Sequence, residues 1–295
     1  MASRGRTIAI AFGVTAGALV LFFVTVWILM SVLEGRGFPG GEKVAVVAVE
    51  GIILASEPVV RELEGYQEDS AVRAVVLRIN SPGGVVGPTQ EIHGAVLRLK
   101  ESGKPVVASL GSVAASGGYY VATATDQIYA NPGTLTGSIG VVMQMANLEG
   151  LLKKVGVEYI IVKSGKFKDV GNFTRSMSPE ERRILQLLLD DVYNQFVEAV
   201  TVGRKLDKAE VLRFADGRIL SGHRAKELGM VDALGGLEEA IESAARLAGL
   251  PEKPKVIFPR RRFSLLDLLK NQLGLTLHAF PHGLPVLRTP LYLMD

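Results

Sequence analysis

The sequence contains no cysteine among its 295 residues. This absence excludes disulfide bonds, a thiolate nucleophile and zinc sites built on cysteine. Aromatic residues are also few, at 6%, and the formal net charge is only +3. Because nucleic-acid binding needs a basic surface and stacking side chains, we expect no nucleic-acid partner. Apart from His278 and His282, the four histidines do not cluster as metal ligands do, and we interpret these two as loop or interfacial residues.

Charged side chains are missing from residues 7–33, a run of 27 positions. As a helix this run would extend about 40 Å, which is enough to cross a bilayer with some tilt. A cleavable signal peptide has an apolar region of only about 7 to 15 residues, so we expect a retained transmembrane helix. Arg4 and Arg6 precede the run, which predicts a cytoplasmic N-terminus and an extracytoplasmic remainder, held at the cell membrane by a single span within residues 1–33.

A glycine-rich linker at residues 34–42 separates this span from an alternating pattern that begins at Lys43. Short β-branched runs alternate there with segments of helical spacing, which predicts a parallel sheet covered by helices, and hence an α/β domain over residues 43–250. The expected strands are residues 43–49, 74–79, 105–110, 127–130, 139–145 and 159–162, and the expected helices are residues 58–66, 88–100, 207–214, 221–228, 237–248 and one that begins after Ser178.

Residues 111–120 predict a strand, a tight turn and a helix, with Ser116 at the turn. The first N–H groups of a helix have no intrahelical partner, so a hydroxyl at this place faces an anion site. Gly117 and Gly118 leave room for a substrate backbone and expose N–H groups, as an oxyanion hole requires. Ser116 is therefore a candidate nucleophile. Taken alone, the stretch also fits, and more simply, a helix-capping serine followed by glycines for close packing.

Three other segments offer groups that could work with Ser116. Asn80-Ser-Pro-Gly-Gly84 follows a predicted strand, at the end where α/β folds place ligands, and could add a second oxyanion donor. Thr134-Leu-Thr-Gly-Ser-Ile-Gly140 supplies the hydroxyl of Ser138, which could hold a catalytic group or cap a turn. Lys163-Ser-Gly-Lys-Phe-Lys-Asp169 supplies three lysines after another predicted strand, and such a group is normally solvated charge.

A serine nucleophile needs a base, and no histidine lies in a segment that could serve Ser116. A lysine is the remaining candidate. To work near neutral pH, a lysine needs a pKa about 3 units below the usual value of ~10.4, which requires burial or a neighbouring cation. Phe167, beside Lys168, predicts an apolar enclosure for that side chain.

Several blocks, in order over residues 43–250, resemble the bacterial signal peptide peptidase A family of Ser–Lys membrane peptidases. They are Asn80-Ser-Pro-Gly-Gly84, Ala115-Ser-Gly-Gly-Tyr119, Thr136-Gly-Ser-Ile-Gly140, Ser164-Gly-Lys-Phe-Lys-Asp169, and Gly217-Arg-Ile-Leu-Ser-Gly222 with Gly229-Met-Val-Asp232. The resemblance implies that Ser116 is the nucleophile and Lys168 the general base. It also implies that Ser138 orients Lys168, and that the N–H groups of Gly83 and Gly117 form the oxyanion hole. Lys166 is the competing lysine, but the family pattern places the base directly after the aromatic residue, which favours Lys168.

The resemblance further implies a fold similar to the proteolytic subunit of Clp protease and to crotonases, a spiral of β-β-α units that assembles into rings. The single-length chain resembles the short form of the family, whose active site is assembled between neighbouring subunits, so we expect a homo-oligomer. No metal or organic cofactor is implied. The function that follows is a membrane-anchored serine endopeptidase that degrades cleaved signal peptides and other hydrophobic or unfolded peptides at the lipid bilayer.

Two other functions are compatible with the sequence. A peptidase of the same chemistry could act on one dedicated membrane partner, as in stomatin-associated relatives. A crotonase-like acyl-CoA protein, or an inactive scaffold, would use the same fold without Ser116 or Lys168, although an extracytoplasmic location argues against CoA.

The C-terminal extension, residues 251–295, has a composition of its own. A basic cluster at residues 260–262 is followed by a strongly apolar stretch at residues 263–277. This order predicts a helix at the membrane surface or on another subunit, and a terminal core helix fits equally well.

Overall fold

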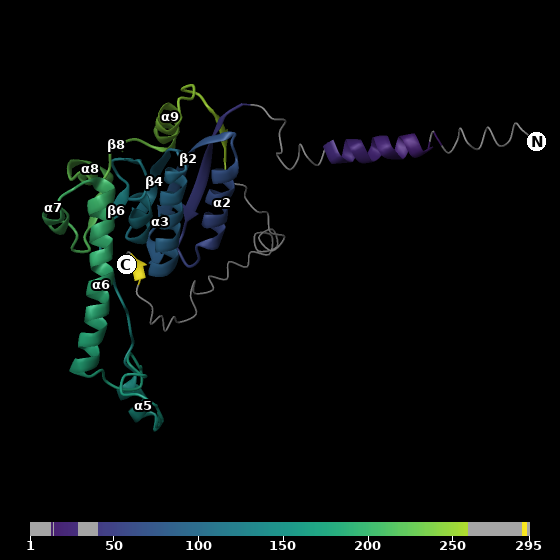
Figure 1. Ribbon diagram of the computed structural model, residues 1–295. Coiled ribbons are helices and arrows are strands. Elements are labelled where there is room, and N and C mark those ends of the chain that lie inside the picture. Colours follow the sequence, from purple (N-terminus) through teal and green to yellow (C-terminus); the bar gives the residue numbers. More distant parts are fainter. Residues whose placement is uncertain (1–12, 14, 29–40, 259–290, 294–295) are drawn as a thin grey trace, which may run out of the picture. The chain divides into compact units, whose positions relative to one another are not determined.

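The computed structural model describes residues 13, 15–28, 41–258 and 291–293 (Figure 1). Contacts divide the chain into two units, Met1–Gly41 and Glu42–Asp295, which are considered separately. In the first unit, Gly13 and residues 15–28 are helical. Within the described ranges, no helix is both long enough and apolar enough to cross a membrane. The expected span at residues 7–33 extends beyond these ranges at both ends, so it stays a prediction.

Three parallel strands form the centre of the second unit, as the sequence predicts. They are β1 (Lys43–Glu50), β2 (Val72–Ser81) and β4 (Val106–Ala115), with β2 between the other two. On its other edge β4 pairs in parallel with β5 (Gln127–Ala130) and then with β6 (Leu135–Gly137). The carboxyl end of β4 is therefore held by β2 on one side and by β6 on the other.

Short strands complete the sheet. β7 (Ile219–Ser221) pairs antiparallel with β6, β8 (Ala233–Leu234) pairs in parallel with β5, and β9 (Lys255–Ile257) pairs in parallel with β1. Because β9 lies beyond residue 250, the sheet continues into the segment that the sequence analysis treated as an extension. The apolar stretch at residues 263–277 lies outside the described residues. A second sheet consists of β3 (Gly83–Val85) and β10 (Leu291–Leu293).

Helices cover both faces of the main sheet (Figure 1). Alternate residues of β1 point to opposite faces, so that Val47 packs in the larger core with α2, α3, α4 and α6, while Val46 packs with α9. The helices of the second unit are α2 (Glu57–Glu68), α3 (Val86–Glu101), α4 (Gly117–Ala122), α5 (Glu149–Lys154), α6 (Pro179–Arg204), α7 (Lys208–Leu212), α8 (Gly222–Glu227) and α9 (Leu237–Leu247).

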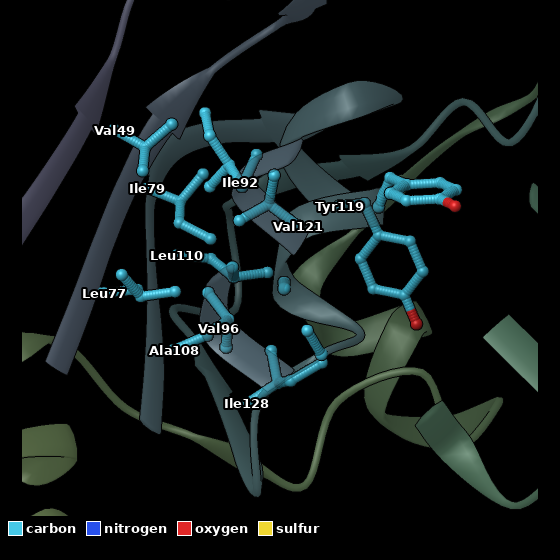
Figure 2. Close-up of a cluster of buried hydrophobic side chains, with 14 of the residues drawn as sticks. Val49, Leu77, Ile79, Ile92, Val96, Ala108, Leu110, Tyr119, Val121 and Ile128 are labelled. Atoms are coloured by element: carbon cyan, nitrogen blue, oxygen red, sulfur yellow. The ribbon is translucent and has the colours of Figure 1, made fainter. Parts of the chain in front are cut away.

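The larger core lies directly beneath the carboxyl ends of β2 and β4. Leu77 and Ile79 of β2 pack there with Ile92 of α3 and Val121 of α4, and each of these side chains is at most 1% exposed (Figure 2). Burying one such side chain stabilises the fold by about 1.5–3 kcal/mol. The elements that carry Ser116 therefore rest on closely packed apolar side chains.

The long helix α6 begins at the residue that the sequence predicts. The Glu181 N–H donates to the Ser178 hydroxyl at 3.2 Å, and the Ser178 N–H donates to the Glu181 carboxylate at 2.8 Å, which forms a capping box. The second half of α6 enters the core through Phe196 and Val200, both fully buried. The first half instead exposes apolar side chains such as Leu187. One end of the helix is therefore anchored and the other presents a surface.

Two expected strands do not form. Residues 139–145 contain no named strand, and the sheet takes its next strand from residues 135–137 instead. Residues 159–162 are irregular, and Ile160 and Val162 are 79% and 95% exposed. Their β-branched side chains favour a strand, but a strand also needs a paired edge and a surface to cover, and neither is present within the described part of this chain.

Candidate active site

Ser116 lies between β4 and α4, at the junction that the sequence predicts. Its φ of 51° falls in a region that residues with a side chain rarely adopt, so the turn is strained. The residue is fully buried, and its Oγ atom has no hydrogen-bond partner among the described residues. Ser116 occupies the N-cap position of α4, but its side chain makes no capping hydrogen bond, so capping does not account for the hydroxyl.

Ser138 is brought next to Ser116 by strand pairing. Ala115 of β4 lies opposite Gly137 of β6, and each serine directly follows its strand. The Ser116 N–H donates to the Gly137 carbonyl at 2.8 Å. Ser138 has a φ of 49° and is 8% exposed, and its N–H donates to the Arg218 carbonyl at 2.8 Å. Since Arg218 directly precedes β7, that edge strand holds the Ser138 turn in place.

Gly117 and Gly83, the two expected oxyanion donors, lie side by side. A Cβ atom at Gly117 would be 3.2 Å from the Gly83 Cα atom, 3.2 Å from the Gly84 nitrogen and 3.0 Å from the Thr89 hydroxyl oxygen. As the first residue of α4, Gly117 has an N–H without an intrahelical acceptor. The Gly83 N–H donates to the Ser81 hydroxyl at 3.1 Å. Gly117 is therefore the better placed donor, and Gly83 would have to exchange its present partner.

One edge of β3, next to these glycines, is paired with a strand from far along the chain. β10 runs antiparallel to β3, with Leu293 opposite Gly83 and Leu291 opposite Val85. The opposite edge of β3 is bonded to Ile53, whose N–H donates to the Gly83 carbonyl at 2.9 Å and whose carbonyl accepts from the Val85 N–H at 2.8 Å. β10 also contacts α4, the helix that begins after Ser116. An extended peptide backbone can thus bind beside the candidate nucleophile.

Lys168 does not meet Ser116 within one chain. Its side chain is exposed, and it makes no hydrogen bond or ion pair among the described residues. It belongs to the turns between α5 and α6, which extend along the first half of α6 beyond the sheet (Figure 1). Phe167 is itself 38% exposed, so the described residues of one chain do not form the predicted apolar enclosure. The reason is that this loop packs outside the α/β core.

Lys166, the competing lysine, is already engaged. Its Nζ atom forms an ion pair with Glu180 at the start of α6 and lies 5.0 Å from the ring centroid of Phe167. Lys166 therefore has an ion-pair partner within the chain, whereas the Lys168 side chain has none among the described residues.

Asp169, the residue after Lys168, is 8% exposed and bound by two cations. Its carboxylate accepts hydrogen bonds from Arg175 at 2.9 Å and from Lys163 at 2.5 Å. These hydrogen bonds, that of Arg175 first, hold the pKa of Asp169 well below its usual range. The sequence analysis counted this loop as solvated charge, whereas the structure shows an ordered ion-pair network.

A cavity of about 630 Å³ lies beside Ser138, between residues 138–142, α6 and residues 215–219. Its lining is mixed: Ile139 and Leu189 are apolar, whereas Asp190 and Asp216 are acidic, so it offers a side chain both kinds of contact. In the described part of the chain, no group of three or more histidine, aspartate or glutamate side chains could hold a metal ion.

Two parts of this site were missed from the sequence. Ser81 lies inside the Asn80–Gly84 block, so its hydroxyl was visible as a possible partner of the Gly83 N–H. The pairing of β10 with β3 had no local signal, because contacts between residues so distant in sequence leave no periodic pattern.

Comparison with known proteins supplies the family. Residues 98–251 match the profile of peptidase family S49. A provisionally named protease of Synechocystis sp. is 45% identical over 80% of this chain and 89% of its own length. A protein of Enterococcus faecium, provisionally named signal peptide peptidase SppA, is 40% identical over 62% of this chain and 53% of its own length. Protease 4 of Salmonella typhi is 34% identical over 81% of this chain but 36% of its own length.

The family match includes Ser116, Ser138 and Lys168, and it covers about half of the chain. The mostly parallel sheet between helices fits the fold that the resemblance implies. An acyl-CoA enzyme of the crotonase type is thereby set aside. The resemblance read from the sequence blocks is confirmed: the chain belongs to peptidase family S49, the signal peptide peptidase A family, and is a serine peptidase.

Proposed function

We propose that this chain is a membrane-anchored endopeptidase for signal peptides and other hydrophobic peptides, with Ser116 as nucleophile and Lys168 as general base. The observation that carries the proposal is the state of Ser116, a buried hydroxyl without a partner among the described residues, on a strained turn beside Gly117 and Ser138. An unpaired buried polar group and a strained backbone both cost free energy, and both are concentrated at functional sites.

In the acylation step, the neutral amine of Lys168 takes the proton of the Ser116 hydroxyl while Oγ attacks the scissile carbonyl carbon. The carbonyl oxygen becomes an oxyanion and accepts a hydrogen bond from the Gly117 N–H. It accepts a second from the Gly83 N–H after the Gly83 N–H gives up its hydrogen bond to Ser81. When the tetrahedral intermediate collapses, the C–N bond breaks and the Lys168 ammonium returns its proton to the leaving amine. An acyl ester on Ser116 remains.

In the deacylation step, Lys168 takes a proton from water, and the resulting hydroxide attacks the ester carbon. The C–Oγ bond breaks, Ser116 is reprotonated by the ammonium, and the peptide leaves with a new carboxyl end. Ser138, held in place by the Arg218 carbonyl, is the group proposed to orient the amine.

Lys168 is proposed to act on the Ser116 of a neighbouring copy of the chain. Two observations support this arrangement. Each residue lacks its partner within one chain, and the segment that carries Lys168 exposes apolar side chains that a second copy would cover. On α5, the loop and the adjoining half of α6, these include Leu151 (57%), Ile160 (79%), Val162 (95%) and Leu187 (61%). Exposed apolar side chains gathered in this way are typical of a protein interface.

The proposed substrate is an extended apolar peptide. The antiparallel pairing of β10 with β3 supports this, because it shows how a peptide strand fits beside Ser116. The uncharged run at residues 7–33 and the short linker at residues 34–42 would keep the domain near the bilayer, where such peptides are released.

The proposal is tested with purified full-length protein and a serine-directed phosphonate probe. Ser116 is expected to be labelled, and Ser116→Ala to lose both label and activity while its assembly is unchanged. Labelling of another serine, with activity retained in Ser116→Ala, would overturn the assignment.

Mixing tests the arrangement between chains. Ser116→Ala and Lys168→Ala are each expected to be inactive, whereas co-refolded mixtures should regain about one quarter of the activity, because one contact in four then joins an intact serine to an intact lysine. Inactive mixtures that assemble normally would show that the dyad is not shared between copies.

A further inference from the structure

The loop that carries Lys168 is closed by the side chain of Lys163. The Lys163 Nζ atom donates to the Lys166 carbonyl at 3.0 Å and to the Asp169 carboxylate at 2.5 Å. These two acceptors lie on either side of Lys168 in the sequence. In the same loop, the Lys168 N–H donates to the Gly165 carbonyl at 3.2 Å. The backbone that presents Lys168 is therefore fixed on both sides, although the Lys168 side chain is exposed.

A second clamp joins this loop to α6. Arg175 donates from Nε to the Asp169 carboxylate at 2.9 Å and from Nη1 to the Glu181 carboxylate at 2.9 Å. Glu181 also accepts the Ser178 N–H at 2.8 Å, as part of the capping box. The planar guanidinium can bind two carboxylates at once with a defined geometry. Through it, the Lys168 loop is attached to a helix whose other half lies in the core.

The four charges of this network balance one another. The side chains of Asp169 and Glu181 are 10% and 6% exposed, and they are paired with Lys163 and Arg175. The hydrogen bond from Arg175, followed by that from Ser178, lowers the pKa of Glu181 to about 2. Both carboxylates therefore stay ionised through the pH range of a peptidase assay. Their two negative charges offset the two cations directly beside the proposed base.

Other charges face the loop from neighbouring elements and are paired separately. From α6, Glu180 pairs with Lys166 of the loop. From α5, Glu149 accepts hydrogen bonds from Lys153 at 2.8 Å and from Ser176 at 2.7 Å. Altering the Asp169 network leaves these pairs in place, so its effect on the local charge can be measured by itself.

We propose that Asp169 and Arg175 are positioning residues for the general base, which with Lys163 and Glu181 fix the Lys168 loop on α6 and keep the charge around Lys168 balanced. This proposal rests on the proposed role of Lys168 in catalysis. It goes further in assigning a task to four side chains, none of which contacts Ser116. The task is to present the amine in one place while the four side chains together add no net charge beside it.

The test compares Asp169→Asn with Arg175→Gln in the full-length assembly, by measuring kcat/KM for a short apolar peptide as a function of pH. Each variant loses the clamp, so kcat/KM at the optimum should fall about 10-fold. Asp169→Asn leaves excess positive charge beside Lys168, which favours its neutral amine. The acid limb of the profile, where activity falls with decreasing pH, should therefore move to lower pH. Arg175→Gln leaves excess negative charge and moves the limb to higher pH. We expect shifts of about 0.5–1 pH unit.

Further variants separate charge from geometry. The double variant Asp169→Asn with Arg175→Gln restores the charge balance without the clamp, so the limb should return to its original position while the rate stays low. Arg175→Lys keeps the charge but not the planar fork, so the limb should stay in place while the rate falls about 3-fold. Arg224→Gln breaks an exposed ion pair with Glu227 on α8 and is the matched control, expected to change neither quantity.

Opposite shifts of the acid limb support the proposal. Shifts in one common direction, or unchanged profiles, would overturn it, because purely structural damage does not move the limb in opposite directions. If Arg175→Gln does not fold, Lys163→Met removes the other cation and must shift the limb to higher pH; an unmoved limb there also overturns the proposal. Retained activity in Lys168→Ala would be a different result, since it would refute the proposed base itself.

Discussion

The two proposed catalytic residues lie in regions of opposite character. Ser116 is fully buried at the end of a paired strand, on a core of apolar side chains, and its backbone is bonded to Gly137. Lys168 is exposed in a loop without helix or strand, held by ion pairs and surrounded by apolar side chains such as Val162 that nothing in the described chain covers. The first region is packed within one chain, whereas the second exposes apolar side chains of the kind found at protein interfaces.

The comparison explains how one chain could remain inactive until it assembles. A serine hydroxyl with no base nearby is a weak nucleophile. Bringing the exposed loop of one copy onto the buried serine of another would supply the base and remove it from water in one step. On this proposal, the ion-pair network on the exposed side shapes the Lys168 loop before a second copy binds.

The largest expected effect separates the two lysines of the exposed loop. Lys168→Ala should lower kcat/KM by about 1,000-fold or more, because it removes the proposed base of the acyl-transfer step. Lys166→Ala should lower it less than about 3-fold, since this replacement breaks only an exposed ion pair with Glu180. Steady-state kinetics on one apolar peptide checks both. The reverse result would identify Lys166 as the base, despite its ion pair with Glu180.

The next effect concerns the buried half of the site. Gly117→Ala should lower kcat/KM about 100-fold, because the added methyl group would lie 3.0–3.2 Å from Thr89 and Gly83 and would displace the proposed oxyanion donor. The matched control is Gly65→Ala in α2, where a Cβ atom meets nothing within 4 Å. That control should retain full activity and a slightly higher melting temperature. Equal activities for the two variants would show that the Gly117 N–H is not used.

The same contrast decides what the sequence predicts well. In the buried region the pattern of β-branched runs predicts β1, β2 and β4 with their parallel order, because each strand there is covered on both faces. Ser116 follows from the end of β4, whereas Ser138 and Gly83 were singled out through the family resemblance, since the strand expected after Ser138 does not form. In the exposed region the same residue types predict a strand at residues 159–162 that does not form, because its surface is not covered within this chain.

Ion-pair networks and strand pairings between distant segments cannot be predicted from a sequence pattern for another reason. Asp169, Arg175 and Glu181 look like scattered surface charges until the loop brings them together. The pairing of β10 with β3 joins segments too distant for any local period to reveal. The Ser178 cap of α6, by contrast, rests on neighbouring residues and was predicted correctly.

A smaller effect is expected where β10 covers the edge of β3. If a substrate strand binds at this edge, β10 competes with it, and removal of residues 291–295 should raise kcat/KM for a short peptide about 3-fold. Tyr292→Pro, which disrupts the pairing, should have the same effect as the deletion. Tyr292→Ala keeps the backbone bonds and should leave activity unchanged. Lower activity after deletion would show that β10 supports the site rather than competes for it.

The last prediction concerns stability rather than activity, and it rests on a titratable group within the buried region. His93 of α3 packs on the ring of Tyr120, with 4.8 Å between ring centroids, and Tyr120 in turn packs on Phe196 at 5.1 Å. Burial, and then the positive charge of Lys100, lowers the pKa of His93 to about 4 from 6.5. His93 is therefore neutral in the folded chain at any pH where the enzyme is expected to work.

The consequence is a pH-dependent contribution of His93 to the stability of the buried region. As the pH falls from about 6.5 to 4, the unfolded chain binds a proton at His93 that the folded chain excludes, so the free energy of unfolding should fall by about 2 kcal/mol. His93→Gln should remove this part of the pH dependence, which urea denaturation at pH 7, 5.5 and 4 would show as a flatter profile. His223→Gln, whose parent side chain is 64% exposed, should keep the original slope. An identical slope in His93→Gln and the unmodified chain would mean that His93 takes up its proton without leaving the core, and that the region around Ser116 is less closely packed than its contacts with Tyr120 indicate.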